Sequence, residues 1–197
     1  GLTKGVKERV QHIKANGDHA VCVYIPGGII HRGYAMRGFE SYLKDLYKRP
    51  EALQRMMDKL CDFWCDNATE MIKAAGPENV DIIYFGEDLG TQDSCMFDPG
   101  TIYAEYMKPR HRRMIETVKG LTNNKAKVCY HCCGSAYHFI PHLLDVGIDA
   151  LNPVQVTAKN MEPERLKEEF GDRLTFWGGI NTQETLPFGT PEEVVEE

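Results

Sequence analysis

The sequence predicts an α/β protein built around a parallel sheet. Short β-branched apolar segments alternate five times with helical patterns, and the connections between them are short and polar. Five such units suit either a doubly wound sheet or part of an eight-unit (β/α)8 TIM barrel. The chain stops soon after Thr190 and Pro191, which open a helix, and a complete domain seldom ends in the first turn of one. We therefore expect about five units of a barrel, within a longer chain.

The expected strands are short apolar runs that end at glycine, proline or polar residues. The first run, Ala-Val-Cys-Val-Tyr-Ile-Pro, contains β-branched residues and is followed by Gly27 and Gly28, as in a buried strand. Runs of the same kind recur along the chain. The predicted strands cover residues 20–26, 80–85, 126–132, 149–154 and 174–177.

Helical patterns fill the segments between these strands. A long region over residues 39–75 contains Pro50, which indicates the first turn of a second helix, because the apolar residues after it recur with a 3.6-residue period. Gly147 and Gly171 mark the ends of two later helices. These helices cover 136–146 and 163–170, an earlier one covers 99–119, and a last one starts at Thr190.

Composition narrows the class of protein. A chain of 197 residues with 42% hydrophobic residues fits one domain with a proper core, which we assign to residues 1–197. The net charge of −6 disfavours a nucleic-acid partner, and no apolar run is long enough to cross a bilayer. Seven cysteines without framework spacing favour a reducing compartment. We expect a soluble, cytoplasmic protein with thiols available for metal or chemistry.

A histidine and two cysteines close the third predicted strand, where the ligands of parallel α/β folds bind. Side chains alternate along a strand, so His131 and Cys133 share one face and Cys132 takes the other. Cys129 lies on the first face but deeper. Imidazole and thiolate at this spacing can share a zinc ion, although two ligands do not complete a site and free cysteine is often buried as a small apolar residue.

Other polar residues have competing interpretations. Glu87 and Asp88 end the second strand and suit a general acid, a general base or an exchangeable metal ligand, but also helix capping or a salt bridge. The basic run at 108–113 could attract an anionic substrate, but it is more typical of a solvated helix face. Core or surface packing is the expected role of Cys61, Cys65, His138 and His142.

Four motifs resemble the uroporphyrinogen decarboxylase superfamily, which includes zinc-dependent corrinoid and coenzyme M methyltransferases. The similarity covers essentially the whole chain and implies a (β/α)8 barrel of which the five strands are the third to the seventh. The domain would then be incomplete at both ends. The motifs are Gly86-Glu87-Asp88-Leu89-Gly90-Thr91-Gln92, Tyr130-His131-Cys132-Cys133-Gly134, Leu151-Asn152-Pro153-Val154-Gln155 and Thr175-Phe176-Trp177-Gly178-Gly179-Ile180.

The resemblance implies zinc bound by His131 and Cys133, because the methyltransferases bind zinc through His-x-Cys on the fifth barrel strand. Their third ligand, a cysteine near the eighth strand, would lie beyond Glu197, and related proteins carry a histidine there instead. Glu87 or Asp88 would be the proton donor or exchangeable ligand.

The leading hypothesis is methyl transfer between a corrinoid protein, or a small methylated compound, and an acceptor. The corrinoid would be a cofactor carried by the partner, and Gln92, Gln155 and Asn181 would bind substrate. Two alternatives stay open. One is metal-free decarboxylation of a tetrapyrrole carboxylate, which needs an arginine motif from a region outside this chain. The other is a non-catalytic barrel piece that serves as a binding or assembly module and forms homo-oligomers.

Overall fold

The computed structural model describes residues 3–48 and 50–197 and contains a five-stranded parallel sheet. Its strand order is β1-β2-β3-β4-β5, so each strand pairs with the next one in the chain and the order never reverses. A doubly wound sheet reverses its order at a switch point, whereas a barrel wall does not. The order therefore confirms a partial barrel. The strands are β1 (Cys22–Tyr24), β2 (Ile82–Gly86), β3 (Lys127–His131), β4 (Ala150–Asn152) and β5 (Thr175–Phe176).

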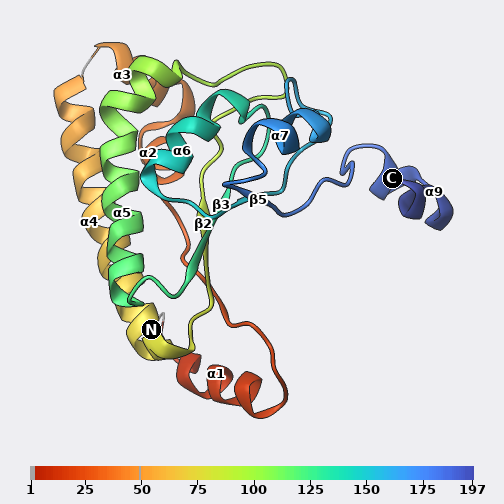
Figure 1. Cartoon of the computed structure of the whole chain (residues 1–197). Helices are drawn as coiled ribbons and strands as arrows, with labels where there is room; N and C mark the ends of the chain where they lie inside the picture. Colours follow the sequence, from red (N-terminus) through yellow and green to blue (C-terminus); the bar gives the residue numbers. More distant parts are fainter. Residues whose placement is uncertain (1–2, 49) are drawn as a thin grey trace.

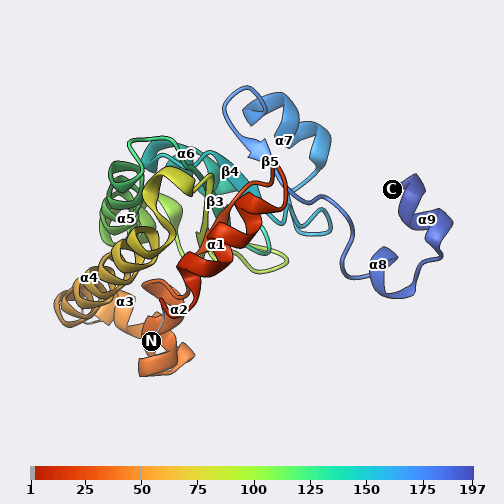
Figure 2. The same ribbon diagram turned by 90° about the horizontal axis from the view of Figure 1, so that it is seen from below.

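Helices cover one face of this sheet (Figure 1). The two long helices α4 (Pro50–Ala75) and α5 (Lys108–Leu121) lie side by side as the main outer layer, as Figures 1 and 2 both show. The short helices α8 (Thr185–Phe188) and α9 (Pro191–Glu196) stretch away from the sheet with the carboxyl end of the chain (Figure 2). The others are α1 (Val6–Ala15), α2 (Ile30–Arg37), α3 (Phe39–Lys48), α6 (Ile140–Val146) and α7 (Pro163–Phe170).

The two faces of the sheet differ in burial, as expected for a piece of barrel wall. Ile83, Val128 and Leu151 face the helices and are fully buried. On the opposite face Tyr24 pairs in register with Tyr84, and Tyr24 is 56% exposed. Helices on both faces would have buried this second row.

The observed strands are shorter than the predicted ones because their ends leave the hydrogen-bonded ladder. The fourth strand ends at Asn152, since Pro153 has no N–H to donate to a neighbouring strand. The predicted helix at 99–119 begins as a π-helix, Pro99–Met107, and becomes α-helical only from Lys108. Helices α1, α2 and α8 were not predicted. Thr190 does cap α9, in a capping box with Glu193.

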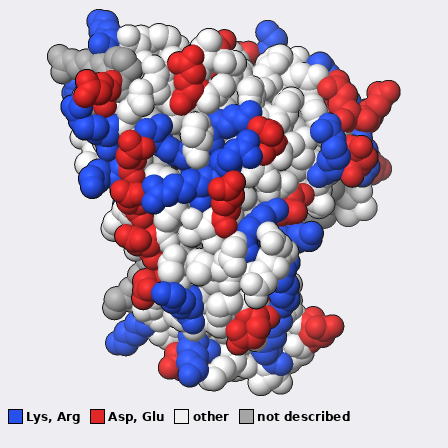
Figure 3. Space-filling model, turned by 60° about the vertical axis from the view of Figure 1, so that its left-hand side comes forward, with Lys and Arg blue, Asp and Glu red and all other residues white. Residues whose placement is uncertain are grey.

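The exposed surface of the helical layer mixes positive and negative side chains (Figure 3). Arg110 pairs with Asp58 of α4 at 2.6 Å, and Arg113 pairs with Asp62 at 2.7 Å. Arg112 pairs with Asp145 at 2.8 Å. Arg112 and Arg113 therefore belong to a solvated, ion-paired surface, as predicted, whereas the side chain of Arg110 is mostly buried and also donates to Gln54 O.

Across residues 3–48 and 50–197, none of the helices is both long and apolar enough to cross a lipid bilayer.

Candidate metal centre

Three potential metal ligands meet where β2 and β3 end. Gly86 of β2 pairs in register with His131 of β3, so the next turn of chain after β2 brings Asp88 beside His131 and Cys133. Gly86 permits this approach, because a Cβ atom there would collide with the backbone of His131. Asp88, which follows a different strand, thus joins the predicted pair.

The ligand atoms lie close enough to share one ion. His131 Nε2 is 3.3 Å from Cys133 Sγ and 3.9 Å from Asp88 Oδ1, and all three ligand atoms lie within 4.8 Å of one another. In a tetrahedral zinc site the nitrogen and sulfur ligands are about 3.6 Å apart, given Zn–N and Zn–S bonds of about 2.0–2.1 and about 2.3 Å. Cys132 is fully buried on the helix side and takes no part.

Hydrogen bonds at Nδ1 of His131 leave the lone pair of Nε2 directed toward Cys133 Sγ, where it could bind a metal. His131 Nδ1 is 2.9 Å from Asn152 Oδ1 and 2.9 Å from the hydroxyl oxygen of Tyr84, which donates its own proton to Asn152 Oδ1 at 2.7 Å. The Asn152 amide is oriented by donating to Trp177 O at 3.0 Å. The two oxygens around Nδ1 accept a hydrogen bond from its N–H. The proton of the neutral ring is therefore on Nδ1, and the lone pair is on Nε2.

His31 is a neighbour of this cluster that sequence reasoning missed. It is the second residue of α2, and its Nε2 lies 3.5 Å from Asp88 Oδ2. The backbone N–H of Asp88 donates to the same nitrogen at 3.2 Å. No sequence signal marks His31, because it lies after the Gly27-Gly28 turn and closes no strand.

Burial and charge set the protonation of the cluster. Partial burial, with the Asp88 charge nearby, raises the pKa of the Cys133 thiol above its usual range. The hydrogen bond from His31 lowers the pKa of the Asp88 carboxyl, and the Cys133 backbone N–H, 2.8 Å from Oδ1, adds to this effect. Without metal, therefore, the thiol is protonated and the carboxylate is ionised at neutral pH.

Zinc affinity is therefore expected to rise with pH. A metal must displace the thiol proton of Cys133, and this step becomes easier by up to about tenfold per pH unit below the thiol pKa. Competitive zinc titrations between about pH 7 and about pH 9 measure the slope. An affinity that stays constant over this interval contradicts thiolate ligation by Cys133.

The two adjacent acidic residues point to opposite sides of the sheet. Asp88 faces the cluster, whereas Glu87 is fully buried against the helices, and its Oε2 lies 2.8 Å from His111 Nε2. His111 is fully buried as well, so the expectation of a solvated basic run was wrong for this residue: α5 turns it inward. Its ring packs against Tyr130, with centroids 5.6 Å apart.

Two of the three predicted substrate residues lie together, and the third lies in another segment. Gln155 and Gln92 meet in the loops after the strands, where Gln155 Nε2 donates to Gln92 Oε1 at 2.9 Å and Gln155 Oε1 accepts from Gly134 N. Asn181 belongs to the segment before α8, and its side-chain oxygen accepts the N–H groups of the two residues Gln183 and Glu184 at 3.0 Å each. It is Gln183 that reaches Gln92, at 3.1 Å.

The remaining candidates lie outside the cluster. Cys129 is buried, which raises its pKa to about 12. Cys61 and Cys65 are buried on α4, consistent with the expected core packing. His138 is exposed, and His142 lies near Lys108 at 3.4 Å.

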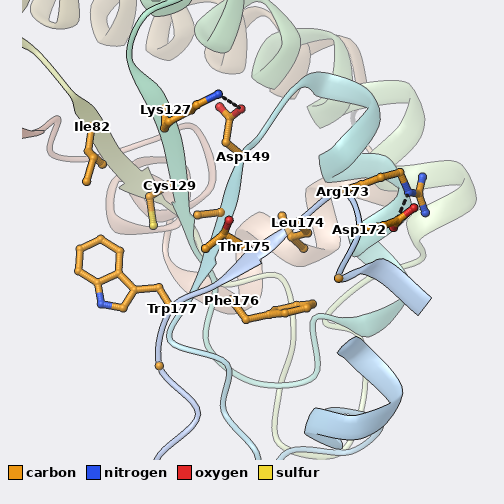
Figure 4. Close-up of a pocket in the computed structure, with 13 residues that line it drawn as sticks. Ile82, Lys127, Cys129, Asp149, Asp172, Arg173, Leu174, Thr175, Phe176 and Trp177 are labelled. Atoms are coloured by element: carbon orange, nitrogen blue, oxygen red, sulfur yellow. Dashed lines mark ion pairs between the residues drawn. The ribbon is translucent and has the colours of Figure 1, made fainter. Parts of the chain in front are cut away.

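Two hollows open on the uncovered face of the sheet. The larger, about 640 Å³, lies along β3, β4 and β5, where Lys127 and Arg173 pair with Asp149 and Asp172 (Figure 4). The other, about 520 Å³, is lined by Tyr24, His31, Tyr84, Gly86 and His131. Active sites of barrels lie at the carboxyl ends of the strands. The smaller hollow, which contains His131, is therefore the one that suits a substrate.

Comparisons with known proteins agree with this architecture. The family model described as uroporphyrinogen decarboxylase (URO-D) matches residues 4–197. A solved structure of a methyltransferase from Methanosarcina mazei is similar, with a TM-score of 0.62 and 15% sequence identity. The similarity covers 99% of this chain and 61% of that one, and at this identity it shows the fold alone. No curated protein matches the chain.

Proposed function

The chain belongs to the uroporphyrinogen decarboxylase (URO-D) family, and on this premise we propose that it is a zinc-dependent methyltransferase of that family. The proposal depends on one observation, the convergence of Asp88, His131 and Cys133 to within 4.8 Å of one another at the carboxyl ends of two strands. Decarboxylation without metal gives no reason for a thiol and an imidazole to meet in this way.

The donor set suits zinc. Nitrogen, sulfur and carboxylate oxygen are the atoms that zinc binds in proteins, and a catalytic site uses three protein ligands and leaves one position for substrate. When bound, zinc acts as a Lewis acid that holds a thiol substrate as its thiolate or polarises a leaving heteroatom.

The protein's own residues prepare this centre. Tyr84 and Asn152 hold the proton of His131 on Nδ1 and so direct Nε2 toward Cys133. Asp88 has a lowered pKa, so it serves as a ligand or proton acceptor at neutral pH rather than as an acid. Of the two acidic neighbours, Asp88 is therefore the one we assign to the chemistry.

The proposed substrate contacts are neutral amides. Gln92 and Gln155 lie in the loops beyond the strand ends, and with Asn181 they would orient a small methylated compound or the cofactor of a corrinoid protein. Amide groups donate and accept hydrogen bonds without requiring a charged substrate.

Metal content and methyl transfer test the proposal together. The purified protein is expected to contain about one zinc per chain and to move a methyl group from methylcobalamin to a thiol, with activity lost on chelation and restored by zinc. Decarboxylation of a porphyrinogen that is insensitive to chelators would instead support the metal-free reaction. A folded, zinc-free dimer without turnover would support an assembly module.

A further inference from the structure

Glu87 is a fully buried carboxylate that the proposed chemistry does not use. Its Oε1 accepts the backbone N–H groups of Ile30 and His31, the latter at 3.0 Å. Its Oε2 is held by His111 Nε2 at 2.8 Å, and His111 Nδ1 lies 3.1 Å from the hydroxyl of the buried Tyr103. Both carboxylate oxygens therefore have partners, as a buried charge requires.

These contacts fix the start of α2. The residue before this helix, Ile29, has no side chain that can cap it, so the first N–H groups of the helix depend on Glu87, which lies 57 residues away from Ile30 in the sequence. A negative charge at this end also suits the helix dipole. Gly28 leaves the space for the carboxylate, since a Cβ atom there would collide with Glu87.

The position of α2 decides where the His31 ring lies. Glu87 accepts the backbone N–H of His31, and His31 Nε2 in turn accepts the backbone N–H of Asp88 at 3.2 Å and lies 3.5 Å from Asp88 Oδ2. The other carboxylate oxygen of Asp88, Oδ1, faces Cys133 and His131. One chain of contacts thus links the buried pair to the metal cluster.

We infer that His31, through the backbone N–H of Asp88 that it accepts and its contact with the carboxylate, holds Asp88 toward His131 and Cys133, and that Glu87, anchored by His111, is the positioning residue that places His31. This inference rests on the proposed function for its metal. Metal-binding carboxylates are themselves oriented by hydrogen-bond partners, and the loss of such a partner commonly weakens metal binding by about 10–100-fold.

Metal affinities in a double-mutant cycle test this link, with Co²⁺ as the spectroscopic probe and Zn²⁺ as its competitor. We expect His31→Ala to weaken Zn²⁺ binding by about 10–100-fold, and Glu87→Ala by about tenfold. The double variant is expected to bind no more weakly than His31→Ala, because both changes remove the same contact. Glu87→Gln should restore binding to within about threefold of the native protein, since its amide oxygen still accepts the two N–H groups.

Exposed residues of the same types serve as controls, and Glu105→Gln and His138→Ala should leave the affinity unchanged. Additive losses in the double variant, or native affinity in His31→Ala, overturn the inference. If Glu87→Ala fails to fold, the Zn²⁺ affinities of His31→Ala, at a partly exposed position, and of Glu87→Gln still test the inference. Native affinity in His31→Ala, or a loss well beyond about threefold in Glu87→Gln, overturns it.

A protein that binds no zinc at all overturns the proposed function and leaves the inference to be tested on the metal-free protein. Imidazole NMR signals of His31 should then move in Glu87→Ala, which removes the acceptor of its backbone N–H, and stay near their native positions in Glu87→Gln and Glu105→Gln. A His31 signal that stays in place in Glu87→Ala overturns the positioning role.

Discussion

Cys133→Ser is expected to lower the zinc affinity by at least about 100-fold, whereas Cys132→Ser leaves it nearly unchanged. Loss of a hydrogen-bond partner of a ligand already costs about 10–100-fold, and loss of a ligand costs more. The two cysteines are adjacent but lie on opposite faces of the strand: Cys133 Sγ lies 3.3 Å from His131 Nε2, and Cys132 is fully buried under the helices.

The two variants control for each other because they make the same chemical change at neighbouring positions. In Cys132→Ser, a hydroxyl replaces a buried thiol that accepts the N–H of Leu89 at 3.4 Å, so we expect a stability loss of about 1–3 kcal/mol with metal binding retained. Metal analysis and zinc titration measure the first effect, and urea unfolding the second. Zinc lost in Cys132→Ser but kept in Cys133→Ser would show that the other face of the strand carries the site.

His111→Ala is expected to reduce the free energy of unfolding by about 3–5 kcal/mol. The change removes the hydrogen-bond partner of a fully buried carboxylate, and a carboxylate left without its partner in the interior is strongly destabilising. It also opens a cavity beside Tyr130 and Tyr103, whose rings pack against His111.

Urea unfolding followed by circular dichroism measures this loss, with His138→Ala as the control. His138 is exposed, so its replacement should change stability by no more than about 0.5 kcal/mol. The combination of Glu87→Gln with His111→Gln should cost less than His111→Ala alone, because two neutral amides leave no unpaired charge. Equal stability in the two single histidine variants would mean that the Glu87–His111 contact contributes nothing to the fold.

Local patterns in the sequence were sufficient for the strands and for the faces of each strand. The alternation over residues 128–133 placed Cys132 among buried residues and His131 beside Cys133, and the structure shows both. This worked because the side chains of a strand alternate with a period of two regardless of which strand lies next to it. Strand ends were less accurate, since the predicted fourth strand extended past Pro153, which has no N–H to donate to a neighbouring strand.

Contacts between segments that are distant in the sequence could not be predicted from such local patterns. Sequence reasoning left Glu87 and Asp88 equivalent, assigned His111 to the surface and overlooked His31 entirely. The structure separates these residues because the register of β2 against β3 brings Asp88 beside Cys133, while the packing of α5 on the sheet brings His111 to Glu87.

The sequence by itself thus determined the fold class, the family motifs and the pair His131 and Cys133 as candidate ligands. Only the tertiary structure decided which carboxylate joins that pair. It also brought His31 of α2 beside Asp88 and His111 of α5 beside Glu87. The physical reason is the separation in sequence of the residues in contact. Alternation along one strand is set by neighbouring peptide units, whereas Glu87 contacts Ile30 across 57 residues and Asp88 contacts Cys133 across 45. Contacts over such separations form only when the strand register and the helix packing are in place.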